Sequence, residues 1–187
     1  MRTRQPTAHP PGIAHTYLRS ETRVLHALVE RQLDIPAFAD RQTYVRYLLM
    51  NRVCASIERG LVQAGIHRLL PDWDQRERGS ALADDLGGLG VWPLPSPRFA
   101  IDADAGTILG WSYVLEGSRL GARVILRIVE SSNEPEVRSA TRFLRHGDGE
   151  DLWTSFKVAL SRIDGDGAAV TRAGVAAKIA FGCFLGA

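Results

Sequence analysis

Apolar residues recur at helical spacing along most of the 187-residue chain. In the first such segment, Leu18, Leu25 and Val29 follow the i, i+3/i+4 and i+7 spacings that place residues on one face of a helix. Similar patterns cover residues 40–65, 72–88, 108–129, 151–163 and 168–185. No segment alternates apolar and polar residues over a length that would build a sheet. The sequence therefore predicts an all-α, single-domain helical bundle.

Proline and glycine mark the expected ends of these helices. Pro36 disfavours helical geometry at the residue before it, and Gly87-Gly88 should end the third helix. The proline-rich segment VWPLPSPRFAIDADAG, residues 91–106, is expected to be a connecting loop. The start, MRTRQPTAHPPG, is basic but lacks the apolar stretch of a secretory signal. We therefore expect residues 1–14 to form a disordered arm before a domain that spans residues 15–187.

Charge and cysteine content exclude several classes of protein. The net charge is +2 and the arginines are dispersed, which is not the profile of a nucleic-acid binder. No run of 18 apolar residues is present, so we expect no membrane-spanning helix. Cys54 and Cys183 fit neither a disulfide framework nor a CxxC metal motif. We expect both to be buried, reduced thiols in a cytoplasmic protein.

The segment YVLEGSRLGARVILRIV, residues 113–129, carries Gly117 and Gly121 inside a helical pattern. Each glycine costs a helix roughly 0.5–1 kcal/mol relative to alanine. The two share one helix face and lie about 6 Å apart along its axis. Their missing side chains would allow either close packing of another helix or the close approach of something flat. Glu116 and Arg119, although adjacent in sequence, point away from this face.

The segment LRSETRVLHALVE places His26 between Thr22 and Glu30, each one helical turn away. Glu30 is therefore positioned to accept a hydrogen bond from one ring nitrogen of His26, which leaves the other nitrogen for a metal. The alternative is a core histidine whose hydrogen bonds are satisfied. We expect only surface, loop or helix-start positions for the other histidines, which are His9, His15, His67 and His146.

Together these segments resemble the heme oxygenases. LRSETRVLHALVE is similar to the proximal helix of that family, and YVLEGSRLGARVI to the distal helix of its bacterial members. RGSALADDLGGLG and the terminal AAKIAFGCFL resemble two further segments of the family. The matches occur in family order over roughly residues 15–187, and order and spacing make them more specific than any single motif.

The resemblance implies an all-α fold that holds heme between the first helix and the glycine-bearing helix. It assigns His26 as the axial iron ligand, and Gly117 and Gly121 as the backbone wall over the open iron face. The cofactor-binding residues that it implies are Arg19, Thr22, Arg23, His26, Glu30, Tyr113, Phe181 and Phe184. Arg19 and Arg23 match positions that face the heme propionates. Core packing explains Phe181 and Phe184 equally well, and Lys157 and Arg162 are further candidates for propionate contacts.

The activity that the resemblance implies is oxidative opening of heme to biliverdin, with release of carbon monoxide and ferrous iron. Heme would be both substrate and cofactor, and O2 the oxidant. Ser118 departs from many family members, which carry an aspartate there to organise distal water. A hydroxyl can hold a water but lacks the charge of a carboxylate. A heme- or bilin-binding sensor or carrier without catalysis is therefore the alternative, and a helical bundle without heme is a third reading.

The implied partners are an electron donor, such as a ferredoxin or a flavoprotein reductase, and a phytochrome-type acceptor of the bilin. We expect neither a nucleic acid nor a membrane as a partner. The meso carbon that is attacked depends on how the propionates orient the heme, which the sequence alone does not reveal.

Overall fold

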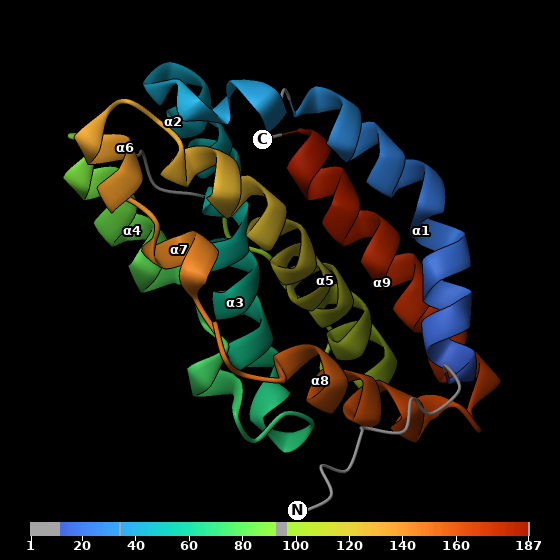
Figure 1. Cartoon of the computed structure of the whole chain (residues 1–187). Coiled ribbons are helices and arrows are strands. Elements are labelled where there is room, and N and C mark those ends of the chain that lie inside the picture. Colours follow the sequence, from blue (N-terminus) through green and yellow to red (C-terminus); the bar gives the residue numbers. More distant parts are fainter. Residues whose placement is uncertain (1–11, 34, 93–96, 187) are drawn as a thin grey trace, which may run out of the picture.

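The computed structural model describes residues 12–33, 35–92 and 97–186, and every regular element within them is a helix (Figure 1). This confirms the all-α prediction. The α-helices are α1 (Ile13–Gln32), α2 (Arg41–Met50), α3 (Arg52–Ala64), α4 (Gly79–Gly88), α5 (Ala105–Glu130), α6 (Pro135–Ser139), α7 (Arg142–Arg145), α8 (Leu152–Leu160) and α9 (Gly167–Leu185). Short 3-10 helices connect them at η1 (Ile35–Ala39), η2 (Ile66–Arg68), η3 (Trp73–Gln75) and η4 (Ser161–Ile163).

The structure divides two helices that the sequence pattern treated as continuous. Asn51 separates α2 from α3. Its side-chain amide donates to the Tyr47 carbonyl at 2.9 Å. The helix predicted after Pro71 is the short η3 followed by α4, which begins only at Gly79. The apolar spacing continues across both breaks, so periodicity alone did not reveal them.

One helix boundary differs, and two short helices were not predicted. α5 begins at Ala105 rather than near Ile108, because Asp104 accepts a hydrogen bond from the Thr107 N–H at 3.1 Å and caps the helix. The one-turn helices α6 and α7 were not predicted, since elements of five and four residues carry no readable periodicity.

The predicted arm is too long at its C-terminal end. Ala14 is buried within α1 and donates its backbone N–H to Asp164 Oδ1 at 2.7 Å. The prediction of a disordered arm was therefore wrong for Ile13 and Ala14, while residues 1–11 lie outside the described residues. Residues 93–96 of the predicted loop also lie outside them.

Helices α1, α9 and α5 run side by side in the same direction, with α9 in contact with both neighbours (Figure 1). On one side, Gly174 packs against Tyr17, and Lys178 pairs with Glu21 at 2.7 Å. On the other side, Ala169 and Ala173 of α9 pack against Gly106 and Gly110 in the first half of α5. In each pair of helices, later residues of one helix contact later residues of the other, so all three helices are parallel.

Helix α9 is long and apolar enough to cross a membrane by length and composition, but half of that window is buried inside the protein. Ala173, Ala177 and Ala180 are fully buried in the hydrophobic core. We therefore interpret α9 as the central core helix.

Candidate functional site

Four glycines lie on one face of α5, within a sector of about 60° because each residue advances a helix by about 100°. A Cβ atom at Gly106 would lie 2.4 Å from the Ala169 carbonyl oxygen, and one at Gly110 would lie 2.3 Å from the Ala173 oxygen. At Gly117 and Gly121, no neighbouring heavy atom comes within 4 Å of such a Cβ. Close helix packing therefore explains the first pair, and the second pair borders open space.

Helix α1 presents His26 at the level of this open face. Thr22 on α1 lies close enough to Tyr113 on α5 to oppose the rise in the pKa of Tyr113 that burial causes. Both helices run parallel to α9, so one further turn along each brings His26 and Gly117 to the same level. The histidine and the glycines that the sequence singled out from separate helices therefore lie at the same level along the helix axes.

The side chain of His26 is 59% exposed, which contradicts the alternative of a core histidine. Its Nδ1 lies 3.4 Å from Glu30 Oε2, as the i, i+4 spacing predicted. Its ring meets the edge of Phe181 with centroids 6.0 Å apart. Phe181 is buried on α9 beneath the imidazole, and Phe184 is buried in the hydrophobic core. With Nδ1 facing Glu30, Nε2 is the nitrogen that remains for a ligand.

Basic side chains gather beside the Thr22–Tyr113 contact. Arg19 and Arg23 are exposed on α1, and Arg19 lies close enough to Tyr113 to oppose the rise in the pKa of Tyr113 that burial causes. Burial, Lys157 and Arg19 together lower the pKa of His15. Lys157 therefore lies near His15, and its contact with the heme propionates stays a prediction.

Two expectations around this cluster were wrong. Arg162 donates to the Leu69 carbonyl at 3.2 Å and is not brought to the cluster. His15 lies within α1 rather than before it, and its ring packs edge-on against Trp153, with centroids 5.7 Å apart, and near Tyr113. The aromatic rings extend the wall of the site beyond Tyr113.

Ser118 is half-buried and its hydroxyl already has two partners. It donates to the Leu115 carbonyl at 2.7 Å and accepts from Arg78 Nη2, also at 2.7 Å. Arg78 is buried, with its guanidinium 4.7 Å from the centre of the Phe143 ring. A positive charge therefore stands directly behind the hydroxyl that occupies the position of the family's aspartate.

Sequence reasoning missed a buried ion cluster behind the glycine face. Glu116 Oε2 accepts from Arg76 Nη1 at 2.9 Å and lies 3.2 Å from Arg119 Nε. Burial lowers the pKa of Arg119 to about 10, and burial together with Arg119 and Arg78 lowers the pKa of His146 to about 4. His146 is therefore part of this cluster and not a surface residue. The available signal was an acid and a base three residues apart, next to the apolar segment that precedes them in α5.

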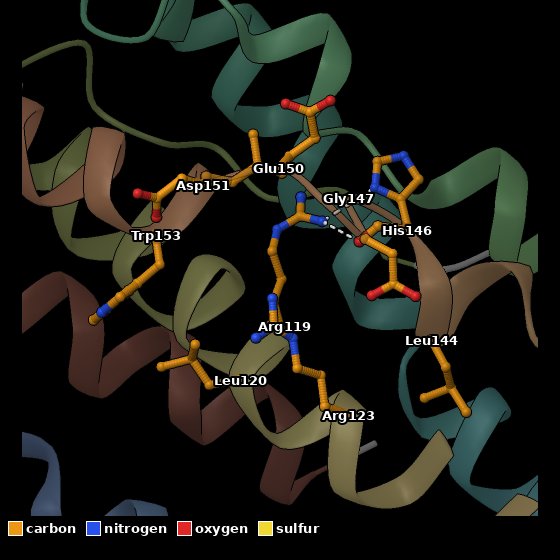
Figure 2. Close-up of a pocket in the computed structure, with 11 residues that line it drawn as sticks. Arg119, Leu120, Arg123, Leu144, His146, Gly147, Glu150, Asp151 and Trp153 are labelled. Atoms are coloured by element: carbon orange, nitrogen blue, oxygen red, sulfur yellow. Dashed lines mark hydrogen bonds between the residues drawn. The ribbon is translucent and has the colours of Figure 1, made fainter. Parts of the chain in front are cut away.

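A cavity of about 140 Å³ lies on this side of α5, between the helix and the segment from Leu144 to Trp153 (Figure 2). Arg119 and Arg123 line it from α5, and Leu120 separates it from the glycine face. Figure 2 shows Arg119 reaching from α5 to His146.

The geometry fits a flat ligand whose metal takes one protein ligand. Among the described residues, no group of three or more His, Cys, Asp or Glu side chains is placed to hold a bare metal ion. One accessible imidazole nitrogen, an open glycine wall and basic side chains at one end suit heme, which brings its own four nitrogen ligands and its carboxylates. Heme is therefore the group that these residues fit.

Comparison with known proteins shows the family to which the chain belongs. No family model matches it. The chain is 30% identical over 128 residues to a curated heme oxygenase of Xanthomonas campestris pv. campestris (strain 8004), a match that covers 66% of this chain and 74% of that relative. Its fold is similar to the NO- and CO-bound heme oxygenase of Neisseria meningitidis, with a TM-score of 0.73, 20% identity, and coverage of 94% of this chain and 89% of that one. The fold is that of a heme oxygenase, and the chain belongs to the heme oxygenase family.

Proposed function

We propose that this protein is an oxidoreductase that opens heme to biliverdin and releases carbon monoxide and ferrous iron. One observation carries the proposal: the accessible imidazole of His26 lies at the level of a helix face where Gly117 and Gly121 leave open space. Family membership supports the same reaction.

His26 Nε2 is the nitrogen that would bind the iron. Glu30, 3.4 Å from Nδ1, would hold the tautomer that leaves Nε2 for the iron. Arg19, Arg23 and Lys157 would bind the heme carboxylates through charge-assisted hydrogen bonds. Bound there, heme supplies the iron that activates O2 and is itself the substrate.

The glycine face and Ser118 would serve oxygen and proton delivery. Without side chains at Gly117 and Gly121, the backbone of α5 leaves room for a diatomic molecule and for water. The Ser118 oxygen retains one acceptor site after bonding Arg78, and that site can orient a water. A water that donates there turns its positive end toward Arg78, so this charge opposes that orientation and Ser118 holds the water more weakly than a carboxylate would.

The reaction needs an external electron donor, and we propose a ferredoxin or a flavoprotein reductase. We also propose a cytoplasmic location, because both cysteines are free and Cys54 is buried. A phytochrome-type protein remains our proposed acceptor of the bilin.

The test begins with hemin added to the purified protein. We expect a Soret band of a histidine-ligated heme, which decays under a reductant and oxygen as a biliverdin band grows. His26→Ala should lose the wild-type Soret band while the apoprotein stays folded, because this side chain is exposed. A Soret band that persists under turnover conditions would instead support a heme carrier. No Soret shift, or the same one in His26→Ala, would refute the proposed ligand.

A further inference from the structure

Glu116 and Arg119 flank the Gly117–Ser118 step of α5 and turn away from the open glycine face. The Glu116 side chain is 0% exposed, and its Oε2 atom faces Arg76 Nη1 at 2.9 Å and Arg119 Nε at 3.2 Å. The charges of the cluster thus lie directly behind the segment that would face the ligand.

Arg76 connects this carboxylate to two other parts of the fold. Its side chain is also 0% exposed. It donates to both carboxylate oxygens of Asp72, at 3.0 and 2.7 Å. It also reaches α8, where Nη1 donates to the Leu152 carbonyl at 3.0 Å and Nη2 to Ser155 Oγ at 2.6 Å. A single planar guanidinium therefore fixes α5 relative to α8 and to the segment before α4.

Arg119 adds a second attachment. Its Nη1 donates to the His146 carbonyl at 3.3 Å (Figure 2) and lies 3.1 Å from His146 Nδ1. Its Nη2 donates to the Arg76 carbonyl. Three of the four residues 116–119 take part in buried arginine contacts. Glu116 is bound by Arg76, Ser118 is bound by Arg78, and Arg119 donates through its own guanidinium. Gly117 is the fourth and has no side chain.

Stability alone is a weak reason for this arrangement. Buried ions lose their hydration, and apolar residues of similar size often pack as favourably. Buried charge-assisted hydrogen bonds instead provide direction, because they hold a helix at one rotation about its axis. Helix α9 holds the first half of the glycine face of α5 through Gly106 and Gly110, but nothing packs on the second half. The rotation of the open half is therefore set from behind.

We propose that Glu116 is a positioning residue: clamped by Arg76 and Arg119, it fixes the Gly117–Gly121 face against the bound heme and thereby selects the meso carbon that is oxidised. This inference rests on the proposed function. It adds a residue that does not touch the ligand and acts through the orientation of α5.

The test compares Glu116→Gln with Glu130→Gln as a matched control. Glutamine keeps the shape of Glu116 and removes its charge, and Glu130 pairs with Arg145 at the exposed end of the same helix. In the apoprotein, we expect amide hydrogens of residues 117–121 to exchange about tenfold faster in Glu116→Gln, with residues 106–112 unchanged. The control should match the wild type in both segments.

With hemin, we expect Glu116→Gln to bind with nearly wild-type affinity. The ratio of biliverdin isomers should change by about tenfold, since a small change in relative barriers suffices. The CO stretching band of the reduced complex should also move, because it reports the surroundings of the distal face. Faster exchange with an unchanged isomer ratio and CO band would leave only a structural role and overturn the proposal.

The remaining outcomes also test the positioning role of Glu116. Wild-type exchange in residues 117–121 of Glu116→Gln would overturn the positioning role. If that variant does not fold, Arg119→Lys, which keeps the charge but loses the fork, should show the same shifts, and wild-type behaviour there would overturn the inference. If the wild type binds hemin but makes no biliverdin, the proposed function fails, while exchange and the CO band still test the positioning. A wild type that binds no hemin overturns both.

Discussion

Individual residues in the candidate site owe their roles to where their side chains lie. His26 and Glu30 form an ordinary i, i+4 pair, with side chains 59% and 60% exposed. Such an exposed pair contributes little to folding stability, roughly 0.3–0.5 kcal/mol. We propose that its value is chemical, because Glu30 next to Nδ1 leaves Nε2 for a ligand.

Replacing Glu30 with alanine tests that role. We expect hemin affinity to fall by about tenfold, the lower end of the range for such outer partners, because the pair is exposed to water. The melting temperature of the apoprotein should not change measurably. Hemin titration followed by the Soret band measures the affinity, with Glu130→Ala as a control on a distant exposed pair. Equal affinities in Glu30→Ala and the wild type would remove Glu30 from the site.

Among the helices, α5 serves two purposes with one pattern. Its 26 residues carry two glycine pairs at the same spacing on the same face. Gly106 and Gly110 allow the backbone of α9 to approach, while Gly117 and Gly121 face open space. The same residue type at the same spacing thus packs a core in one half and leaves a site in the other.

Two alanine substitutions should therefore have opposite effects on the apoprotein. In Gly110→Ala the new methyl group would meet the Ala173 oxygen at 2.3 Å and Ala176 Cβ at 2.8 Å. We expect a loss of about 1–3 kcal/mol or more from overpacking. Gly117→Ala meets nothing and gains helix propensity, so the apoprotein should become more stable by roughly 0.5–1 kcal/mol.

Urea unfolding of both apoproteins measures these free energies, and hemin titration provides the second readout. We expect Gly117→Ala to weaken hemin binding although it stabilises the protein, because its methyl group enters the ligand's space. A Gly117→Ala protein that is destabilised would show that the open face is closed in solution.

Across the protein, the site depends on helices that are joined through α9 and a few direct contacts. Helix α1 reaches α5 mainly through α9 and the Thr22–Tyr113 contact. A ligand held by His26 on one side and by the glycine face on the other would add a direct link between them. Folding stability and ligand binding are therefore coupled.

Hemin should raise the unfolding free energy by mass action. At a free concentration 100 times the dissociation constant, the gain is about 2.7 kcal/mol if only the folded protein binds. Thermal unfolding with and without hemin measures the gain. His26→Ala should lose most of it, and an equal gain in that variant would indicate binding elsewhere.

Acid stability should report the buried cluster around Arg119. His146 has a pKa of about 4 in the folded protein against 6.5 in the unfolded chain, because burial and two arginines disfavour its charge. The unfolded state therefore binds more protons between these values, and stability falls as pH drops from 6.5 toward 4. His146→Gln should flatten the pH dependence in this window. Urea unfolding at pH 4.5, 5.5 and 7 compares the two proteins, and parallel curves would contradict the assignment.

Local patterns predicted the helical class of the fold and most of its long helices. The apolar spacing predicted an all-α fold, because residues three and four apart in the sequence lie on the same face of a helix. The one-turn spacing also singled out His26 with Glu30 and Gly117 with Gly121, and the resemblance to heme oxygenases implied their place in a site. The His26–Glu30 distance of 3.4 Å agrees with that local geometry. The apolar spacing did not predict the helix breaks at Asn51 and before Gly79, because it continues through both.

Only the tertiary structure decided what lies opposite each local feature. It showed that α9 covers one glycine pair and leaves the other open, and that His26 stands at the level of the open pair. It also brought Arg76 and Arg78 behind Glu116 and Ser118, from residues some 40 positions away in the chain. The sequence by itself determined which faces the helices have. Their partners depend on packing between distant segments, which no local spacing encodes.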